Sequence, residues 1–218
     1  WTAVSEVTFG RDDSGDSGFS VSVDRRLNDA WSVGGVVELN SSTTPLRAYR
    51  EDIESDLAGI DFTYRRDESF GINGGLRTQD FSDSNTKNSA FVDGHWRWVT
   101  GPRYKLDITG AAYASSASEI PTPYFNPASD RELQVGLDNR WLQYRRYDQS
   151  VLHRLHVQAG TYDQKNLGTD GIWSLDYDVI WSVDDALDLR GGWRRAKRFY
   201  DGESEYQTFY RVGLDWRF

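Results

Sequence analysis

The sequence predicts an all-β protein, a transmembrane antiparallel up-and-down β-barrel of about 12 strands. Three observations predict it. Apolar and polar residues alternate with a period of two along most of the chain. Short and long connections alternate between these segments, which is typical of outer-membrane barrels. The composition is polar, with 38% hydrophobic residues, yet 14% of the residues are aromatic, which suits a thin outward-facing apolar band around a hydrated interior.

The alternation is clearest at the end of the chain. Val212, Leu214 and Trp216 occupy even positions there, while Arg211 and Asp215 occupy odd ones. We therefore expect the first three to point away from the barrel axis. Extended to the whole chain, the pattern predicts strands near residues 1–10, 18–27, 31–41, 56–66, 69–81, 88–99, 103–116, 131–146, 151–164, 171–184, 187–200 and 204–218. No segment shows the period of an amphipathic helix.

The connections between these segments form two groups. Short ones lie near residues 28–29, 67–68, 101–102, 148–149 and 184–185, and the longer ones cover 11–18, 40–55, 81–87, 117–130, 165–170 and 201–203. In barrels of the outer membrane the short side is periplasmic. No apolar run approaches the roughly 18 residues of a spanning helix, and in hydrocarbon the other solution is a closed barrel. The alternative is a soluble β-sandwich, whose dry core should favour Leu, Ile and Val over the Trp found here.

Charge and composition exclude several function classes. The net charge is −9, opposite in sign to that of a typical nucleic-acid binder. There is no Cys and there are only three His residues, so we predict no metal site and no cofactor. His153 and His156 should face opposite sides of a strand. No hydrolase or nucleotide-binding motif occurs, and we expect a non-enzyme with no catalytic residues.

Several segments resemble the C-terminal porin domain of poly-β-1,6-N-acetyl-D-glucosamine export proteins from biofilm-forming Gram-negative bacteria. The more specific ones are Thr44-Pro-Leu-Arg47 and Thr122-Pro-Tyr-Phe-Asn-Pro127. The others are Arg26–Asn40, Tyr144–Tyr147, His153–Leu155, Gly160–Tyr162, Tyr200–Glu205 and the terminal Asp215–Phe218. The resemblance covers nearly the whole chain, so we expect one barrel domain over residues 1–218.

The resemblance implies a place in the bacterial outer membrane and export of a partly de-N-acetylated, partly cationic polymer. It implies contact with outer-membrane lipid and lipopolysaccharide, and a monomer. Family members carry an N-terminal tetratricopeptide-repeat region that binds the periplasmic deacetylase, and this region is absent from the sequence. The family barrel is similar to a sixteen-stranded pore. Either the first four strands precede Trp1, or this barrel closes at twelve.

The expected site is a set of inward carboxylates that hold the ammonium groups of the polymer weakly and at many points. The polymer-guiding candidates are Asp61, Asp93, Asp107, Asp176, Asp178, Asp188, Glu205 and Asp215. The candidates for stacking on sugar rings are Phe91, Tyr113, Tyr162 and Phe209. Acidic residues in the longer loops would add a negative mouth that attracts cations. Those residues are Asp12, Asp13, Asp16, Glu51, Asp52, Glu54, Asp56, Glu119, Asp163, Asp170, Asp201 and Glu203.

Two other interpretations stay open. Nearly equal numbers of acidic and basic side chains fall on the predicted inner face, so many could be ion pairs that only stiffen the wall. The protein would then be a structural or adhesive barrel with a plugged lumen. The third interpretation is export of another polysaccharide, such as cellulose, for which an acidic mouth has no role.

Overall fold

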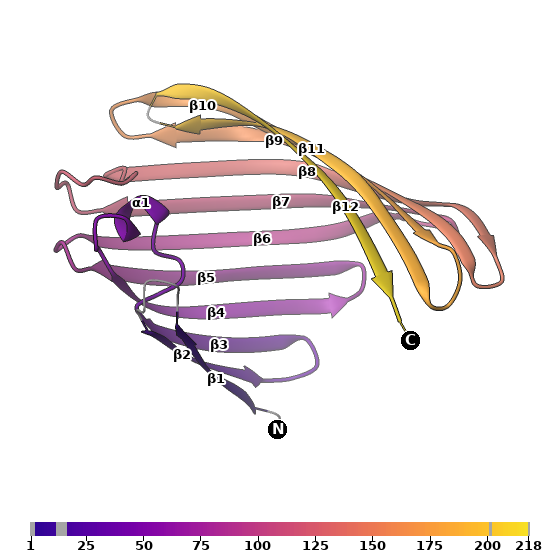
Figure 1. The fold of residues 1–218 in the computed structure, drawn as a ribbon, viewed down its shortest axis with the longest axis horizontal. Coiled ribbons are helices and arrows are strands. Elements are labelled where there is room, and N and C mark those ends of the chain that lie inside the picture. Colours follow the sequence, from indigo (N-terminus) through magenta and orange to yellow (C-terminus); the bar gives the residue numbers. More distant parts are fainter. Residues whose placement is uncertain (1–2, 12–16, 201, 218) are drawn as a thin grey trace. The chain divides into compact units, whose positions relative to one another are not determined.

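Antiparallel strands make up most of the chain in a computed structural model, which describes residues 3–11, 17–200 and 202–217. Within these residues the strands form one hydrogen-bonded sheet of twelve in sequential order, as Figure 1 shows. The strands are β1 (Ala3–Arg11), β2 (Ser17–Arg26), β3 (Trp31–Leu39), β4 (Ser55–Asp67), β5 (Phe70–Phe81), β6 (Thr86–Thr100), β7 (Tyr104–Ala117), β8 (Ser129–Arg146), β9 (Gln149–Gln164), β10 (Gly168–Ser182), β11 (Leu187–Tyr200) and β12 (Glu203–Trp216). The all-β, antiparallel, up-and-down prediction is confirmed.

The predicted strand boundaries lie within three residues of those in the structure. β11 has the bounds that the alternation predicts, whereas β10 begins at Gly168 rather than near residue 171. The reason is a tight turn. Asn166 and Gly168 have φ values of 71° and 89°, a left-handed conformation that Gly and Asn tolerate best. The chain therefore reverses within a few residues, and the ladder extends into the predicted loop.

One short helix was not predicted from the sequence. Leu46–Tyr49 forms the short helix α1 in the connection between β3 and β4. Pro45 precedes it with a φ of −57°, which is suited to a helix start. A single turn is too short to show a 3.6-residue period. Within the described ranges, no helix is long and apolar enough to cross a membrane.

The chain divides into two compact units. The first unit comprises Trp1–Asp93, Ala112–Arg131 and Gln164–Asn166, and the second comprises Gly94–Ala111, Glu132–Asp163 and Leu167–Phe218. In the first, β2 to β5 pair in register so that Gly34 lies opposite both Asp24 and Asp61, and Asp61 lies opposite Gly75.

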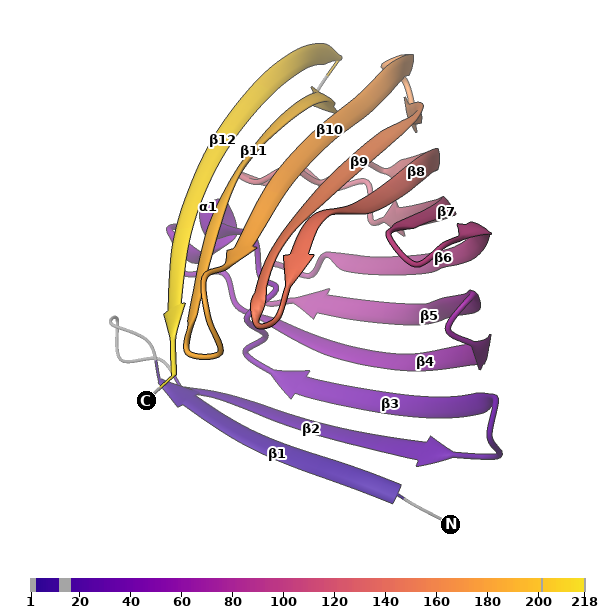
Figure 2. The same cartoon turned by 90° about the vertical axis from the view of Figure 1, so that its right-hand side faces the viewer.

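In the second unit, β10, β11 and β12 run side by side, as the orange to yellow strands of Figures 1 and 2 show. Their register places Asp178, Gly192 and Arg211 in line across three strands. Cross-strand neighbours of this kind share one face of a sheet. The same face of each of these strands therefore carries residues of complementary charge.

Apolar side chains cover the opposite face of both units. Val23, Ile60 and Leu76 in the first unit are exposed. In the second unit Val212, Leu214 and Trp216 are exposed to 93%, 66% and 66%, while their odd-numbered neighbours carry the charges. These three residues are exposed, as the predicted outward position requires, whereas a soluble sandwich would have buried them.

Few side chains are fully buried, and those that are gather mainly near the longer connections. In the first unit Ala48 of α1 packs with Phe81 and Tyr124. Phe81 and Tyr124 stack with ring centroids 5.1 Å apart. In the second unit Tyr162, Ile172 and Phe199 form another small cluster. The first of these clusters ties three connections together in a fixed arrangement.

Candidate functional site

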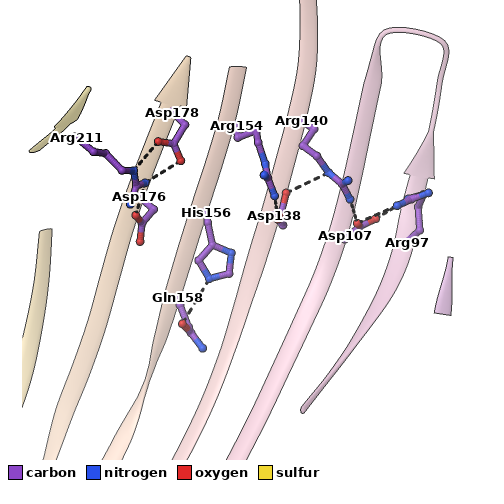
Figure 3. Close-up of polar contacts among 10 residues, drawn as sticks. All are labelled: Arg97, Asp107, Asp138, Arg140, Arg154, His156, Gln158, Asp176, Asp178 and Arg211. Atoms are coloured by element: carbon purple, nitrogen blue, oxygen red, sulfur yellow. Dashed lines mark hydrogen bonds and ion pairs between the residues drawn. The ribbon is translucent and has the colours of Figure 1, made fainter. Parts of the chain in front are cut away.

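A row of charged side chains crosses β6, β7, β8 and β9 within the second unit (Figure 3). Asp107 accepts hydrogen bonds from Arg97 at 2.7 and 3.2 Å, and Arg140 donates to its other side. Asp138 continues the row, 3.4 Å from Arg140 and 3.7 Å from Arg154. We call these five residues the charged row. Acidic and basic groups alternate along it, so each arginine lies between or beside carboxylates.

A second group, the Arg211 cluster, lies on β10, β11 and β12 of the same unit. Arg211 binds Asp178 and Asp176, with nitrogen–oxygen distances of 2.8 and 2.9 Å. Arg194 lies 3.2 Å from Asp176. Gly192 stands between Asp178 and Arg211 in the register, and a Cβ at this glycine would overlap the Asp178 carboxylate. The absent side chain lets a carboxylate on β10 reach an arginine two strands away.

The first unit holds a smaller charged group beside an aromatic ring. Arg77 on β5 lies 3.1 Å from Asp61 on β4, and its guanidinium carbon lies 5.3 Å from the centre of the Phe91 ring. Both Asp61 and Phe91 crowd the space above Gly75. Asp93, two residues from Phe91 on β6, accepts a hydrogen bond from Asn73 at 3.1 Å. One carboxylate and an aromatic ring therefore meet above Gly75, and Asp93 lies two residues along the strand that carries the ring.

The remaining acidic candidates lie on β11 and β12. Asp188 pairs with Arg217 at 3.1 Å, and Asp215 with Arg190 at 3.5 Å. Glu205 lies exposed, opposite Arg198 in the register. Six of the eight acidic candidates thus have an arginine partner within the described residues, and Asp93 has an asparagine.

The four aromatic candidates differ in how much of the ring is open. Phe209 on β12 is 56% exposed, whereas Tyr162 is 8% exposed because it packs against Ile172 and Phe199. Phe91 and Tyr113 are half-buried on β6 and β7. An open ring face is needed for stacking on a sugar. The structure therefore favours Phe209, Phe91 and Tyr113 over Tyr162 as places where a sugar can stack.

Exposure separates the ion pairs into two kinds. The Asp107 and Arg97 side chains are 5% and 9% exposed, so breaking that pair would leave a charge out of water. Arg211 is 50% exposed and Asp178 is 33% exposed. A pair as open as this contributes about 0–1 kcal/mol. Breaking the Asp107 pair is therefore costly, whereas Asp178 can exchange partners at little cost.

The longer connections carry some of the predicted negative charge. Glu119 pairs with Lys165, whose hydrogen bond and charge lower the pKa of the Glu119 carboxyl. The Tyr124 hydroxyl donates to Asp83 and accepts from Asn85. Asp12, Asp13, Asp16 and Asp201 lie outside the described residues.

The histidines have separate surroundings. His153 stacks on Trp141, with centroids 4.4 Å apart, and contacts the Tyr177 hydroxyl at 2.7 Å. His156 instead lies 3.4 Å from Gln158 (Figure 3). Across residues 3–11, 17–200 and 202–217, no group of three His, Cys, Asp or Glu side chains suits a metal ion.

Sequence reasoning found the carboxylates but not their particular partners. Arg77, Arg97, Arg140 and Arg211 were not among the site candidates. The signal that could have found Arg77 and Arg97 is the hairpin register, because residues at equal distances from the turn lie opposite each other on the two strands. The register also places Gly75 and Gly192 opposite Asp61 and Asp178.

Comparison with known sequences gives a family match. The family model described as the PgaA membrane beta barrel domain matches residues 2–218. The poly-β-1,6-N-acetyl-D-glucosamine export protein of Escherichia coli strain K12 is 28% identical over 194 residues, which is 88% of this chain and 24% of that protein. The export protein of Escherichia coli O157:H7 gives the same values. The chain thus spans about a quarter of the length of these curated relatives.

Two solved structures resemble the chain. A bacterial polysaccharide outer membrane secretin superimposes with a TM-score of 0.83 at 27% identity, covering 93% of this chain and 70% of that one. The β domain of the Bordetella autotransporter BrkA gives a TM-score of 0.56 at 12% identity, covering 93% and 90%. The second likeness concerns the fold alone.

Proposed function

This chain belongs to the PgaA membrane β-barrel domain family and lies in the bacterial outer membrane, and on this premise we propose that it is part of a polysaccharide-export porin. The polymer we propose is partly de-N-acetylated poly-β-1,6-N-acetyl-D-glucosamine, exported for biofilm formation. The role is passive guidance of a chain rather than catalysis. The polymer carries ammonium groups wherever an acetyl group has been removed, so it needs carboxylates along its path.

The observation that carries this proposal is the pairing of Arg211, which is 50% exposed, with Asp178, which is 33% exposed, and with the more buried Asp176. A passing ammonium group can replace the guanidinium at one of these carboxylates, because exposed pairs differ little in free energy. The displaced arginine keeps the second carboxylate. Each contact is weak and easily exchanged, so a polymer held at many such points can slide without stalling.

The group around Phe91 supports the same role in the first unit. Arg77 now occupies the space near the Phe91 ring, 5.3 Å from its centre. A cation over an aromatic face gains about 0.5–1 kcal/mol at an exposed site. A glucosamine unit could present its ammonium to Asp61 or Asp93 and its apolar ring face to Phe91. Phe209 and Tyr113 are further places for a sugar to stack.

The experiment is channel block in planar bilayers, made with the full-length natural protein. β-1,6-linked glucosamine oligomers are added to the wild type, Asp178→Asn and Asp61→Asn. We expect a several-fold shorter block in each variant, since an amide cannot neutralise ammonium. Asp29→Asn is the matched control, because Asp29 lies exposed in a turn, bound only to Arg26. Block that is the same in all four proteins would contradict guidance.

A plugged, structural barrel is the second candidate, and the charged row favours it, because Asp107 and Arg97 are almost fully buried. A plugged barrel would be silent in the same bilayers before any oligomer is added. Export of a neutral polymer such as cellulose predicts a third result. Fully N-acetylated oligomers would then block as well as glucosamine oligomers do.

The proposal has two further parts. We expect a monomer, which light scattering of the purified protein in detergent would test by mass. We assign contact with the periplasmic deacetylase to the tetratricopeptide-repeat region of longer family members. This chain alone should therefore fail to retain the deacetylase in a pull-down.

A further inference from the structure

Three arginines meet in one hollow of the second unit. Arg154 of β9, Arg190 of β11 and Arg211 of β12 line a space of about 300 Å³ together with Asp178 and Ile180 of β10. The lining thus holds three positive groups and one negative group. Elsewhere on this wall, as in the charged row, arginines and carboxylates alternate.

Two of these arginines hold their carboxylates loosely. Arg154 lies 3.7 Å from Asp138, and Arg190 lies 3.5 Å from Asp215. The first distance is outside hydrogen-bonding range and the second is at its limit. Their side chains are 47% and 55% exposed. A guanidinium carries five N–H donors, so both arginines have donors to offer to a ligand in the hollow.

The backbone around the hollow leaves it open. Gly213 lies opposite Arg190 in the register, so the residue that directly faces this arginine on β12 has no side chain. A Cβ at Gly213 would approach only the Arg190 Cβ, at 3.8 Å. Glycine at this position therefore leaves room beside Arg190 in the hollow.

We propose that this hollow is a binding site for a small oxyanion, of which inorganic phosphate is the simplest example. Planar arginine forks suit the oxygens of phosphate or carboxylate, which they bind through paired hydrogen bonds. The consequence for transport rests on the function proposed above. Each of the three arginines already lies beside a carboxylate, so a bound dianion would give this part of the wall a net negative charge. The anion would thus make this part of the wall attractive for a cationic chain.

The test measures phosphate binding to the full-length protein in nanodiscs by calorimetry, at constant ionic strength with chloride as the replaced ion. We expect binding by the wild type and a loss of about tenfold or more in Arg154→Gln and in Arg190→Gln, since each removes hydrogen bonds to a charged group. Asp178→Asn should bind phosphate more tightly. Arg65→Gln is the matched control, because it removes the same charge from the first unit.

Three results would overturn the proposal. The first is that the folded wild type does not bind phosphate. The second is that Arg65→Gln weakens phosphate binding as much as Arg154→Gln and Arg190→Gln do. The third is that the protein binds a carboxylate-bearing oligosaccharide but not inorganic phosphate. The last result would assign the hollow to an anionic group on a polymer. The calorimetric result does not depend on glucosamine-oligomer block. The phosphate site can therefore be refuted while the guidance proposal stands, and guidance can be refuted while the phosphate site stands.

Discussion

The Asp178 carboxylate lies across Gly192, its partner on the neighbouring strand, and a Cβ at this glycine would overlap it. The same relationship occurs twice in the first unit, between Asp24 and Gly34 and between Asp61 and Gly75. In each case the missing side chain gives the carboxylate room to lie along the wall. Glycine weakens a strand, so its presence opposite these aspartates has a packing reason.

Gly192→Ala should therefore destabilise the second unit. The new methyl group would push Asp178 away from Arg211, and overpacking of this kind costs about 1–3 kcal/mol. The measurement is urea unfolding in detergent micelles. Gly191→Ala is the matched control, because a Cβ at Gly191 meets nothing within 4 Å, and we expect a change below about 0.5 kcal/mol. Equal losses in the two variants would show that the carboxylate does not need this space.

Asp107→Asn should lower the free energy of unfolding far more than Asp61→Asn does. The first change leaves Arg97 charged at 9% exposure, and removing one partner of a buried pair typically costs about 3–5 kcal/mol. The pair of Arg77 and Asp61 is 36% and 35% exposed, so about 0–1 kcal/mol is expected. The free energy of unfolding of each variant, measured in low and in high salt, checks both expected losses. Only the Asp61 pair should weaken with added salt, and similar losses in both variants would refute the distinction.

Much of the fold could be predicted because period-two alternation is a local signal. Residues 187–200 show it, and β11 has those bounds. The outward position of Val212 and Trp216 follows from the same signal. Pairing within a hairpin is almost as local. The register that places Asp178 opposite Gly192 follows once the turn at residues 183–186 is located.

The rest depends on contacts between distant parts of the chain. Arg211 reaches Asp176 and Asp178 across a whole strand, and no alternation pattern indicates how far a side chain extends. Tyr124 meets Phe81 and Ala48 only after three connections fold together. The Thr-Pro motifs near residues 44 and 122 marked two of these connections as specific segments. Their meeting could not be predicted without the strand order.

Tyr124→Phe should loosen this loop cluster. The hydroxyl donates to Asp83 at 3.0 Å and accepts from the Asn85 amide at 2.9 Å, and Asn85 is 1% exposed. Leaving a buried amide unpaired costs about 1–3 kcal/mol. Hydrogen exchange of residues 118–128 should accelerate. Tyr147→Phe, at an 85% exposed position in a turn, should change nothing, and unaltered exchange in Tyr124→Phe would mean that the hydroxyl does not hold the loops.

The same hydroxyl predicts how the loop cluster responds to alkali. Burial, reinforced by the nearby Asp83 carboxylate, raises the pKa of Tyr124 from 10.0 to about 12. The folded loops therefore keep a proton that the unfolded chain releases. The stabilisation is complete below pH 10 and is lost as the pH rises toward 12.

Carbon-13 NMR of labelled tyrosine should show a ring that titrates near pH 12, and this signal should be absent from Tyr124→Phe. The free energy of unfolding, measured in urea, should fall more steeply with pH in the wild type than in Tyr124→Phe between pH 10 and about 12. The wild type releases the Tyr124 proton on unfolding in this range, whereas the variant has no such proton. A Tyr124 ring that titrates near pH 10 would contradict both expectations. The cluster of Ala48, Phe81 and Tyr124 would then be open to solvent. The Thr-Pro segments near residues 44 and 122 would not be held in a fixed arrangement.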